Sequence, residues 1–216
     1  MFIGHFALGL AAKKIDNRPS LGTMLMAAQF IDLLWPFFLI FGIEEVKIEP
    51  GNTAFTPLNF IHYPWSHSLP AVIIWAVLFG GIYYLSSRNK KGAILLSLLV
   101  MSHWLLDLIT HRPDLPLNFS ETKMAGLGLW NNKMLTLVVE GGLFLSGSFI
   151  YLRSTRENSK KGIILVGCFL GLLAAIYIMN SFGPPPPNEK MIAYAALLQW
   201  IFVGWGYWID KKNKAT

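Results

Sequence analysis

Residues 92–110 have the sequence GAILLSLLVMSHWLLDLIT, an apolar run that holds His103 and Asp107. A helix of this length measures about 28 Å at 1.5 Å per residue, close to the roughly 30 Å hydrocarbon core of a bilayer. The spacing of four residues places both polar side chains on one helical face, and His111 follows at the same spacing. The stretch therefore predicts a membrane-spanning helix that directs an imidazole and a carboxylate toward the same neighbours.

The rest of the chain has a similar composition. Hydrophobic residues make up 54% of its 216 residues and charged residues 14%, whereas a soluble domain carries about 25% charged residues. A shorter apolar segment, 2–12, reaches only about halfway across a bilayer, and we expect a re-entrant or interfacial helix there. The expected fold class is an all-α integral membrane helical bundle, a single domain over residues 1–216. Its six predicted spans are residues 21–42, 66–86, 92–110, 134–152, 163–182 and 191–209.

Composition also excludes several kinds of site and partner. Cys168 is the single cysteine, so an intramolecular disulfide and a cysteine-based zinc site are excluded. The net charge of +6 comes from basic residues in short connectors, which membrane orientation explains better than a nucleic-acid partner does. No positive region precedes the first apolar stretch, so we expect it to be retained and not cleaved as a signal peptide. Nothing in the sequence specifies an oligomeric state.

The connectors between the predicted spans alternate in basic charge. Five of the 18 lysines and arginines fall in one set of connectors: Lys47, Arg112, Lys123, Lys133 and Lys190. The other thirteen fall in the alternate set: Lys13, Lys14, Arg18, Arg88, Lys90, Lys91, Arg153, Arg156, Lys160, Lys161, Lys211, Lys212 and Lys214. The positive-inside rule then predicts that the N-terminal loop and the C-terminus are cytoplasmic.

Few ionisable residues lie within the spans, and they are of metal-binding type. A charge at the bilayer centre costs about 2.5–3.5 kcal/mol on insertion scales, so such residues usually mark a functional interior. Helical rise places Asp32 and His103 both about 16 Å from the cytoplasmic end of their spans. Imidazole and carboxylate groups are ligands of zinc, manganese and iron. We therefore expect one or two metal ions bound among His5, Asp32, His67, His103 and Asp107.

Each of these residues also has a structural interpretation. A histidine or aspartate in a span can simply hydrogen-bond between helices, and His67 can follow Ser66 as the N-cap of a helix. Glu140 precedes two glycines, where close helix approach is possible; it is either the proton acceptor of a metal site or a structural hydrogen-bond partner. His111, Arg112 and Asp114 form either a headgroup-binding lip or a solvated loop at the outer rim.

Several motifs resemble those of the bacterial membrane-bound, predicted metal-dependent hydrolases. They are HYPWSHS (62–68), FIDLLWP (30–36), SHWLLDLIT (102–110) and the GH at residues 4–5. With GHFALGLAAKK, SHWLLDLITHRPDLPL, GLGLWN and FGPPPP added, nearly the whole chain looks like a narrower group of bacterial inner-membrane proteins.

This resemblance implies the same five metal ligands, with His62 as a further candidate, and a location in the bacterial cytoplasmic (inner) membrane. The histidine–aspartate pairs of the hydrolases are similar to those of zinc phospholipases C and nucleases, which act on phosphoesters. Where the hydrolases have a first aspartate this chain has Phe30, which puts a second metal in doubt.

The expected function is metal-dependent hydrolysis of a membrane lipid or lipid-linked ester or phosphoester. We expect zinc as the metal, with manganese or iron as alternatives, Glu140 and His111 as catalytic base or acid, and His62, Arg112 and Asp114 as substrate-binding residues. The polar residues gather in a metal-site half, about 1–152, and spans 163–209 resemble a scaffold, which favours an enzyme. The alternatives are a permease that uses the same cluster and a scaffold without chemistry.

Overall fold

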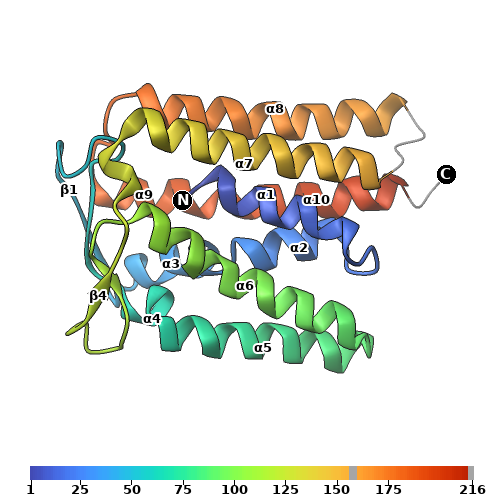
Figure 1. Ribbon diagram of the computed structural model, residues 1–216, viewed down its shortest axis with the longest axis horizontal. Helices are drawn as coiled ribbons and strands as arrows, with labels where there is room; N and C mark the ends of the chain where they lie inside the picture. Colours follow the sequence, from blue (N-terminus) through green and yellow to red (C-terminus); the bar gives the residue numbers. More distant parts are fainter. Residues whose placement is uncertain (156–159, 214–216) are drawn as a thin grey trace.

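Long apolar helices make up most of the protein, as the composition predicts. The computed structural model describes residues 1–155 and 160–213. Within these residues five helical segments are long and apolar enough to cross a membrane, and the bent pair α2–α3 can supply a sixth. The five are α5 (Leu69–Ser87), α6 (Lys90–Thr110), α7 (Lys133–Ser154), α8 (Lys160–Phe182) and the segment Glu189–Lys211, which covers α9 (Glu189–Leu197) and most of α10 (Gln199–Asn213). The prediction of an all-α, multi-pass membrane bundle is confirmed, and Figure 1 shows these helices side by side.

The predicted span 21–42 is wrong in one respect, because it is two helices. α2 (Leu21–Ala28) and α3 (Phe30–Ile40) meet at Gln29 with a bend of 59°. The buried Gln29 side chain donates a hydrogen bond to the carbonyl of Phe2, at 3.4 Å, instead of lying against its own helix. The break therefore lies where the chain's first residues meet the bundle.

The short first segment forms helix α1 (Ile3–Ala11), followed by a turn of 3₁₀ helix, η1 (Ala12–Lys14). Seven of the nine α1 residues are buried, and Figure 1 shows the helix inside the bundle with its N-terminal end near mid-length. An interfacial helix would keep one face in water, so the buried position fits the re-entrant alternative.

The two long connectors that carry the strands fold at one end of the bundle. Strands β1 (Glu45–Ile48) and β2 (Leu58–His62) pair antiparallel, and helix α4 (Pro64–His67) follows them. Strands β3 (Leu115–Pro116) and β4 (Met124–Ala125) form a second antiparallel pair, followed by the 3₁₀ turn η2 (Leu129–Asn131). These elements lie together at the left of Figure 1.

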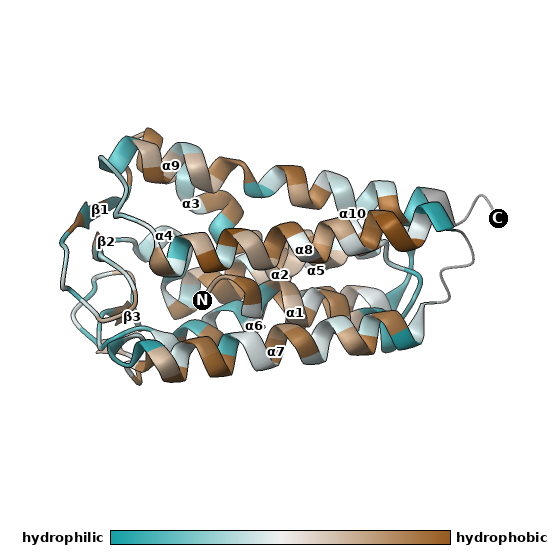
Figure 2. Cartoon of the chain, turned by 90° about the horizontal axis from the view of Figure 1, so that it is seen from above, coloured by the Kyte–Doolittle hydropathy of each residue, from teal (hydrophilic) through white to brown (hydrophobic). Residues whose placement is uncertain are grey.

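The opposite end gathers the connectors that are richest in basic residues. Lys13 lies 3.4 Å from Asp210 of α10, and Asn89, before α6, donates to Asp16 at 3.3 Å. Figure 2 shows hydrophilic residues at this end of the bundle. Arg156 and Lys214 of the predicted cytoplasmic set lie outside the described residues.

Two apolar clusters hold the bundle together, and α1 belongs to the second of them. One joins α2, α5 and α6 through residues such as Ala28, Val72 and Leu96. The other joins α1 to α7, α8 and α10 through aromatic residues, among them Phe6 and Phe169. The outward faces of the long helices remain apolar and exposed, as lipid contact requires. Helices α8 and α10 therefore support α1 from the side away from α6.

Helix α7 packs closely against α1 at Gly147. A Cβ added there would lie 2.4 Å from the carbonyl oxygen of Ala7 on α1, whereas one added at Gly141 or Gly142 would meet no described atom within 4 Å. The expectation that the two glycines after Glu140 allow close packing is wrong, because that face of α7 points away from its neighbours.

Candidate metal centre

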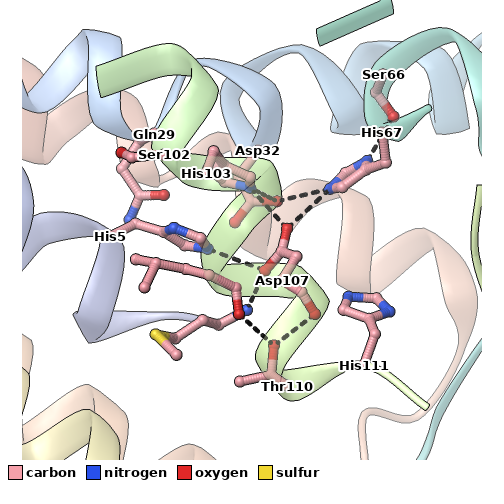
Figure 3. Close-up of polar contacts among 12 residues, drawn as sticks. His5, Gln29, Asp32, Ser66, His67, Ser102, His103, Asp107, Thr110 and His111 are labelled. Carbon is pink, nitrogen blue, oxygen red and sulfur yellow. Dashed lines mark hydrogen bonds and ion pairs between the residues drawn. The ribbon is translucent and has the colours of Figure 1, made fainter. Parts of the chain in front are cut away.

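Helix α6 contributes two buried ligand-type side chains one turn apart. Asn89 caps its start by accepting a hydrogen bond from the Gly92 N–H, so the helix runs unbroken through the bilayer-length segment. His103 and Asp107 are both buried, and Nε2 of His103 lies 3.1 Å from Oδ2 of Asp107. The expected one-face arrangement is thus present, and Figure 3 shows the two side chains near each other. They lie seven and three residues before the end of α6 at Thr110.

The helix break beside α6 orients His103. Nδ1 of His103 lies 2.9 Å from the carbonyl oxygen of Ala28, the last residue of α2. A carbonyl can only accept, so Nδ1 carries the proton and Nε2 presents its lone pair. Within the described part of the chain this buried Nε2 makes no hydrogen bond. A carbonyl behind the ring and a free nitrogen in front are the arrangement of a metal-binding histidine.

Asp32 and His67 face the α6 pair from two other segments. Nε2 of His67 lies 3.5 Å from Oδ1 of Asp32 and 3.9 Å from Oδ2 of Asp107. Nε2 of His103 lies 3.6 Å from the same oxygen of Asp32. Figure 3 shows these side chains converging from α3, α4 and α6. Their convergence, expected from depth along the helices, is therefore present in the structure.

Asp32, His67 and His103 form one group whose ligand atoms all lie within 4.8 Å of one another, and Asp107 adjoins both of its histidines. A tetrahedron whose nitrogen and oxygen ligands lie about 2.0–2.1 Å from its centre has edges of about 3.3 Å. The four N···O distances lie between 3.1 and 3.9 Å. The donor set fits a divalent ion that accepts imidazole and carboxylate, such as zinc.

His5 meets the other oxygen of the shared carboxylate. Its Nε2 lies 3.1 Å from Oδ1 of Asp107, and its ring stacks on His103 with centroids 3.7 Å apart. The α-amino group of Met1 lies 2.6 Å from the same oxygen. His5, His103 and Asp107 thus form a second, overlapping group of ligand type, on the opposite side of Asp107 from His67.

Glu140 lies against the start of α1. Its Oε2 accepts a hydrogen bond from the N–H of Phe2, at 3.0 Å, and the residue is fully buried. No described donor bonds the other oxygen, Oε1. The carboxylate therefore anchors the re-entrant helix and keeps one oxygen free.

The outer-rim residues are tied to each other. His111 is buried, with Nδ1 3.0 Å from Asp114 Oδ1, and Nε of Arg112 donates to Asp114 Oδ2 at 2.9 Å. Burial lowers the pKa of His111. The His62 side chain is 46% exposed and lies 2.5 Å from Glu121. These contacts order the loops above the centre.

Two residues that sequence reasoning missed stand behind His67. Ser66 is not a helix cap, because Ser68 caps α5 by accepting from the Ala71 N–H. Ser66 instead bonds His67 and the buried Glu44. Burial raises the pKa of Glu44 to about 7. Glu44 stands in the loop sequence FGIEEVK, where nothing distinguishes it from a solvated charge.

The five residues differ in exposure. The side chain of Asp32 is 21% exposed, whereas those of His5, His67, His103 and Asp107 are between 0 and 4% exposed. Asp32, at the first turn of α3, is therefore the most exposed member of the cluster.

Comparison with known proteins adds no relative to this description. No family model, no curated protein and no solved structure matches the chain.

Proposed function

We propose that this protein is a membrane-embedded, metal-dependent hydrolase of a lipid or lipid-linked ester or phosphoester. The observation that supports it is the convergence of two imidazole nitrogens and two carboxylate oxygens, whose imidazole-to-carboxylate distances of 3.1–3.9 Å lie near the roughly 3.3 Å edge of a tetrahedral site. Carboxylates are costly inside a bilayer, and a bound cation would offset the cost of placing two together. The ligands would be Asp32, His67, His103 and Asp107, with zinc as the favoured ion and manganese or iron as alternatives.

A bound divalent cation supplies Lewis-acid chemistry, because it lowers the pKa of a coordinated water and polarises a carbonyl or phosphoryl oxygen. The chain's own residues hold and expose the reacting groups. The His5 ring packs on His103, and its Nε2 lies within hydrogen-bond distance of Oδ1 of Asp107. Glu140 keeps one carboxylate oxygen free to accept a proton. His111 stands at the rim as a second candidate for proton transfer.

The position of Asp32, the most exposed residue of the cluster, favours a lipid substrate. Asp32 belongs to the bent pair α2–α3, which together is long and apolar enough to form a membrane span. The ligand atoms on α6 lie between one and two turns from the end near the hairpins, about 5–10 Å by helical rise. We propose that this end lies on the outer side of the cytoplasmic (inner) membrane of a bacterium, and that the N-terminal loop and the C-terminus lie in the cytoplasm. Arg112, Asp114 and His62 would then face the headgroup of an outer-leaflet substrate.

A second candidate, a permease for a metal or small molecule, is favoured by the broken helix. Transporters commonly bind their cargo where a membrane helix is discontinuous, and the α2–α3 break lies beside Asp32 and His103. In this alternative the same side chains hold a passing ion.

Metal content tests both candidates against a plain scaffold. We expect detergent-purified protein to contain about one zinc, manganese or iron ion per chain, measured by elemental analysis. His103→Ala and Asp107→Asn should each lose it while remaining folded, because each removes one ligand atom. His62→Ala is the matched control, since it removes a histidine outside the convergence. Metal-free wild-type protein that takes up none of the three metals would contradict the proposal.

Turnover then separates the two candidates. Metal-loaded protein is screened against a panel of lipid esters and phosphoesters, and the same preparation in proteoliposomes is tested for metal uptake. Hydrolysis of a panel member without uptake supports the enzyme. Uptake without hydrolysis supports the permease.

A further inference from the structure

A hydrogen-bonded chain runs from the loop before β1 to the back of the His67 ring. Glu44 is buried, at 4% exposure, and its Oε1 accepts the Ser66 N–H at 2.7 Å. Its Oε2 lies 2.6 Å from the Ser66 hydroxyl, and that hydroxyl lies 2.6 Å from Nδ1 of His67. The three residues come from two segments that are 22 positions apart, and α4 holds Ser66 and His67 next to each other.

Proton positions along this chain follow from what each group can do. An ionised carboxylate can only accept hydrogen bonds, so the Ser66 hydroxyl donates its single hydrogen bond to Glu44. The hydroxyl oxygen then has only lone pairs to offer His67, and Nδ1 of His67 must supply the proton. Nε2 is left with its lone pair, and it is Nε2 that faces Asp32 and Asp107.

If the Glu44 carboxylate is removed, the other tautomer of His67, with its proton on Nε2, is favoured. Asp32 and Asp107 attract a proton to Nε2 of His67, because their oxygens lie 3.5 and 3.9 Å away. A Ser66 hydroxyl that is no longer held by Glu44 can turn and donate to Nδ1. Nε2 would then carry the proton and could not bind a cation.

We infer that Glu44, acting through Ser66, is a positioning residue that fixes the tautomer of His67 and keeps its Nε2 available as a ligand. The inference rests on the proposed metal site for its purpose, although the tautomer itself is a property of the metal-free protein. Ser66 thus holds the proton of His67 on Nδ1, as the Ala28 carbonyl does for His103. Partners of this kind typically change metal affinity 10- to 100-fold.

The tautomer is measured by ¹⁵N NMR of histidine-labelled, metal-free protein. The experiment is run at pH 8, above the pKa of about 7 to which burial raises Glu44, and a pH series identifies the range in which the ring is neutral. We expect His67, assigned by comparison with His67→Asn, to carry its proton on Nδ1 in the wild type. In Glu44→Ala that proton should move largely to Nε2. Unchanged protonation of Nδ1 in a folded Glu44→Ala protein would overturn the inference.

Two further variants guard against misfolding and general loop effects. Ser66→Ala breaks the chain at its middle and should shift the tautomer in the same way, with Glu44 still present. Glu45→Ala is the matched control, because Glu45 is the exposed neighbour and pairs only with Lys47, at 3.4 Å, among the described contacts. It should leave the His67 spectrum unchanged, and a shift as large as that of Glu44→Ala would count against the inference.

Zinc affinity, measured by competition with a chelator, separates this inference from the proposed function. We expect Glu44→Ala and Ser66→Ala to bind zinc 10- to 100-fold more weakly than wild type, and Glu45→Ala to bind it equally. Wild-type affinity in Glu44→Ala would overturn the inference and leave the metal site standing. Absence of zinc, manganese and iron binding by the wild type would overturn the metal site, and the NMR result alone would then decide the role of Glu44.

Discussion

At the scale of single residues, the convergence of the histidine and aspartate side chains was predictable and the groups behind them were not. All five predicted ligand residues lie in two overlapping groups that share His103, and their binding of a metal stays a prediction. Charged and imidazole side chains at bilayer depth usually mark a functional interior. Glu44 escaped notice since an acidic residue in a connector is usually solvated. Its burial depends on the loop that folds over α4, and no periodicity in the sequence encodes that contact.

Glu140 has the structural role that one of its sequence interpretations gave it, and its role as proton acceptor stays a prediction. One oxygen holds the Phe2 N–H and the other makes no bond within the described residues. Glu140→Gln retains an acceptor for Phe2 but takes up no proton near pH 7. We expect it to keep its fold and metal and to lose turnover by about 10²- to 10⁴-fold, the size of a general-base contribution.

Glu140→Ala provides the contrast. It leaves a buried N–H without its acceptor, at a cost of about 1–3 kcal/mol, and should lower the thermal unfolding midpoint in detergent. A Glu140→Gln protein that hydrolyses the identified substrate at the wild-type rate would restrict Glu140 to its structural role.

At the scale of helices, span positions were predictable and discontinuities were not. Twenty-residue apolar runs located α5 to α8 to within a few residues, since bilayer thickness sets their length. The break between α2 and α3 falls at Gln29, where neither glycine nor proline marks it. It depends on the contact of Gln29 with Phe2, from a segment 27 residues earlier.

The contact of α1 with α7 gives the prediction at this scale. Gly147→Ala would force a methyl group to within 2.4 Å of the Ala7 carbonyl oxygen. Overpacking of this kind costs about 1–3 kcal/mol, so we expect a lower unfolding midpoint and weaker metal retention, because His5 lies on the displaced helix. Gly142→Ala, on the same helix, should be neutral or slightly stabilising. Equal midpoints for the two variants would show that α1 is not held at Gly147.

At the scale of the whole molecule, the alternation of basic charge agrees with the two ends of the bundle. The two β-hairpins share one end, and the Lys13–Asp210 and Asn89–Asp16 contacts join the connectors of the other. Which end faces the cytoplasm depends on the membrane, and the positive-inside rule makes that a prediction.

Cysteine labelling tests the orientation in intact cells. Cys168, within the membrane-spanning helix α8, is the single native cysteine, so the background is Cys168→Ser. Ser120→Cys, in the exposed loop between β3 and β4, should react with a membrane-impermeant thiol reagent. Lys91→Cys, exposed at the start of α6, should react only after the cells are opened. The reverse pattern would invert the topology and place the metal centre nearer the inner face.

The buried position of α1 has a consequence for biosynthesis. α1 leaves the ribosome before α7, the helix that it packs against, which ends 143 residues later, at Ser154. At about 5–20 residues per second, roughly 7–30 s separate the two. Until α6 emerges, during the first part of that delay, His5 cannot contact Asp107 or His103. α1 is also too short to cross the bilayer by itself. The centre can therefore be completed only late in translation, by the return of the first helix into a bundle made after it.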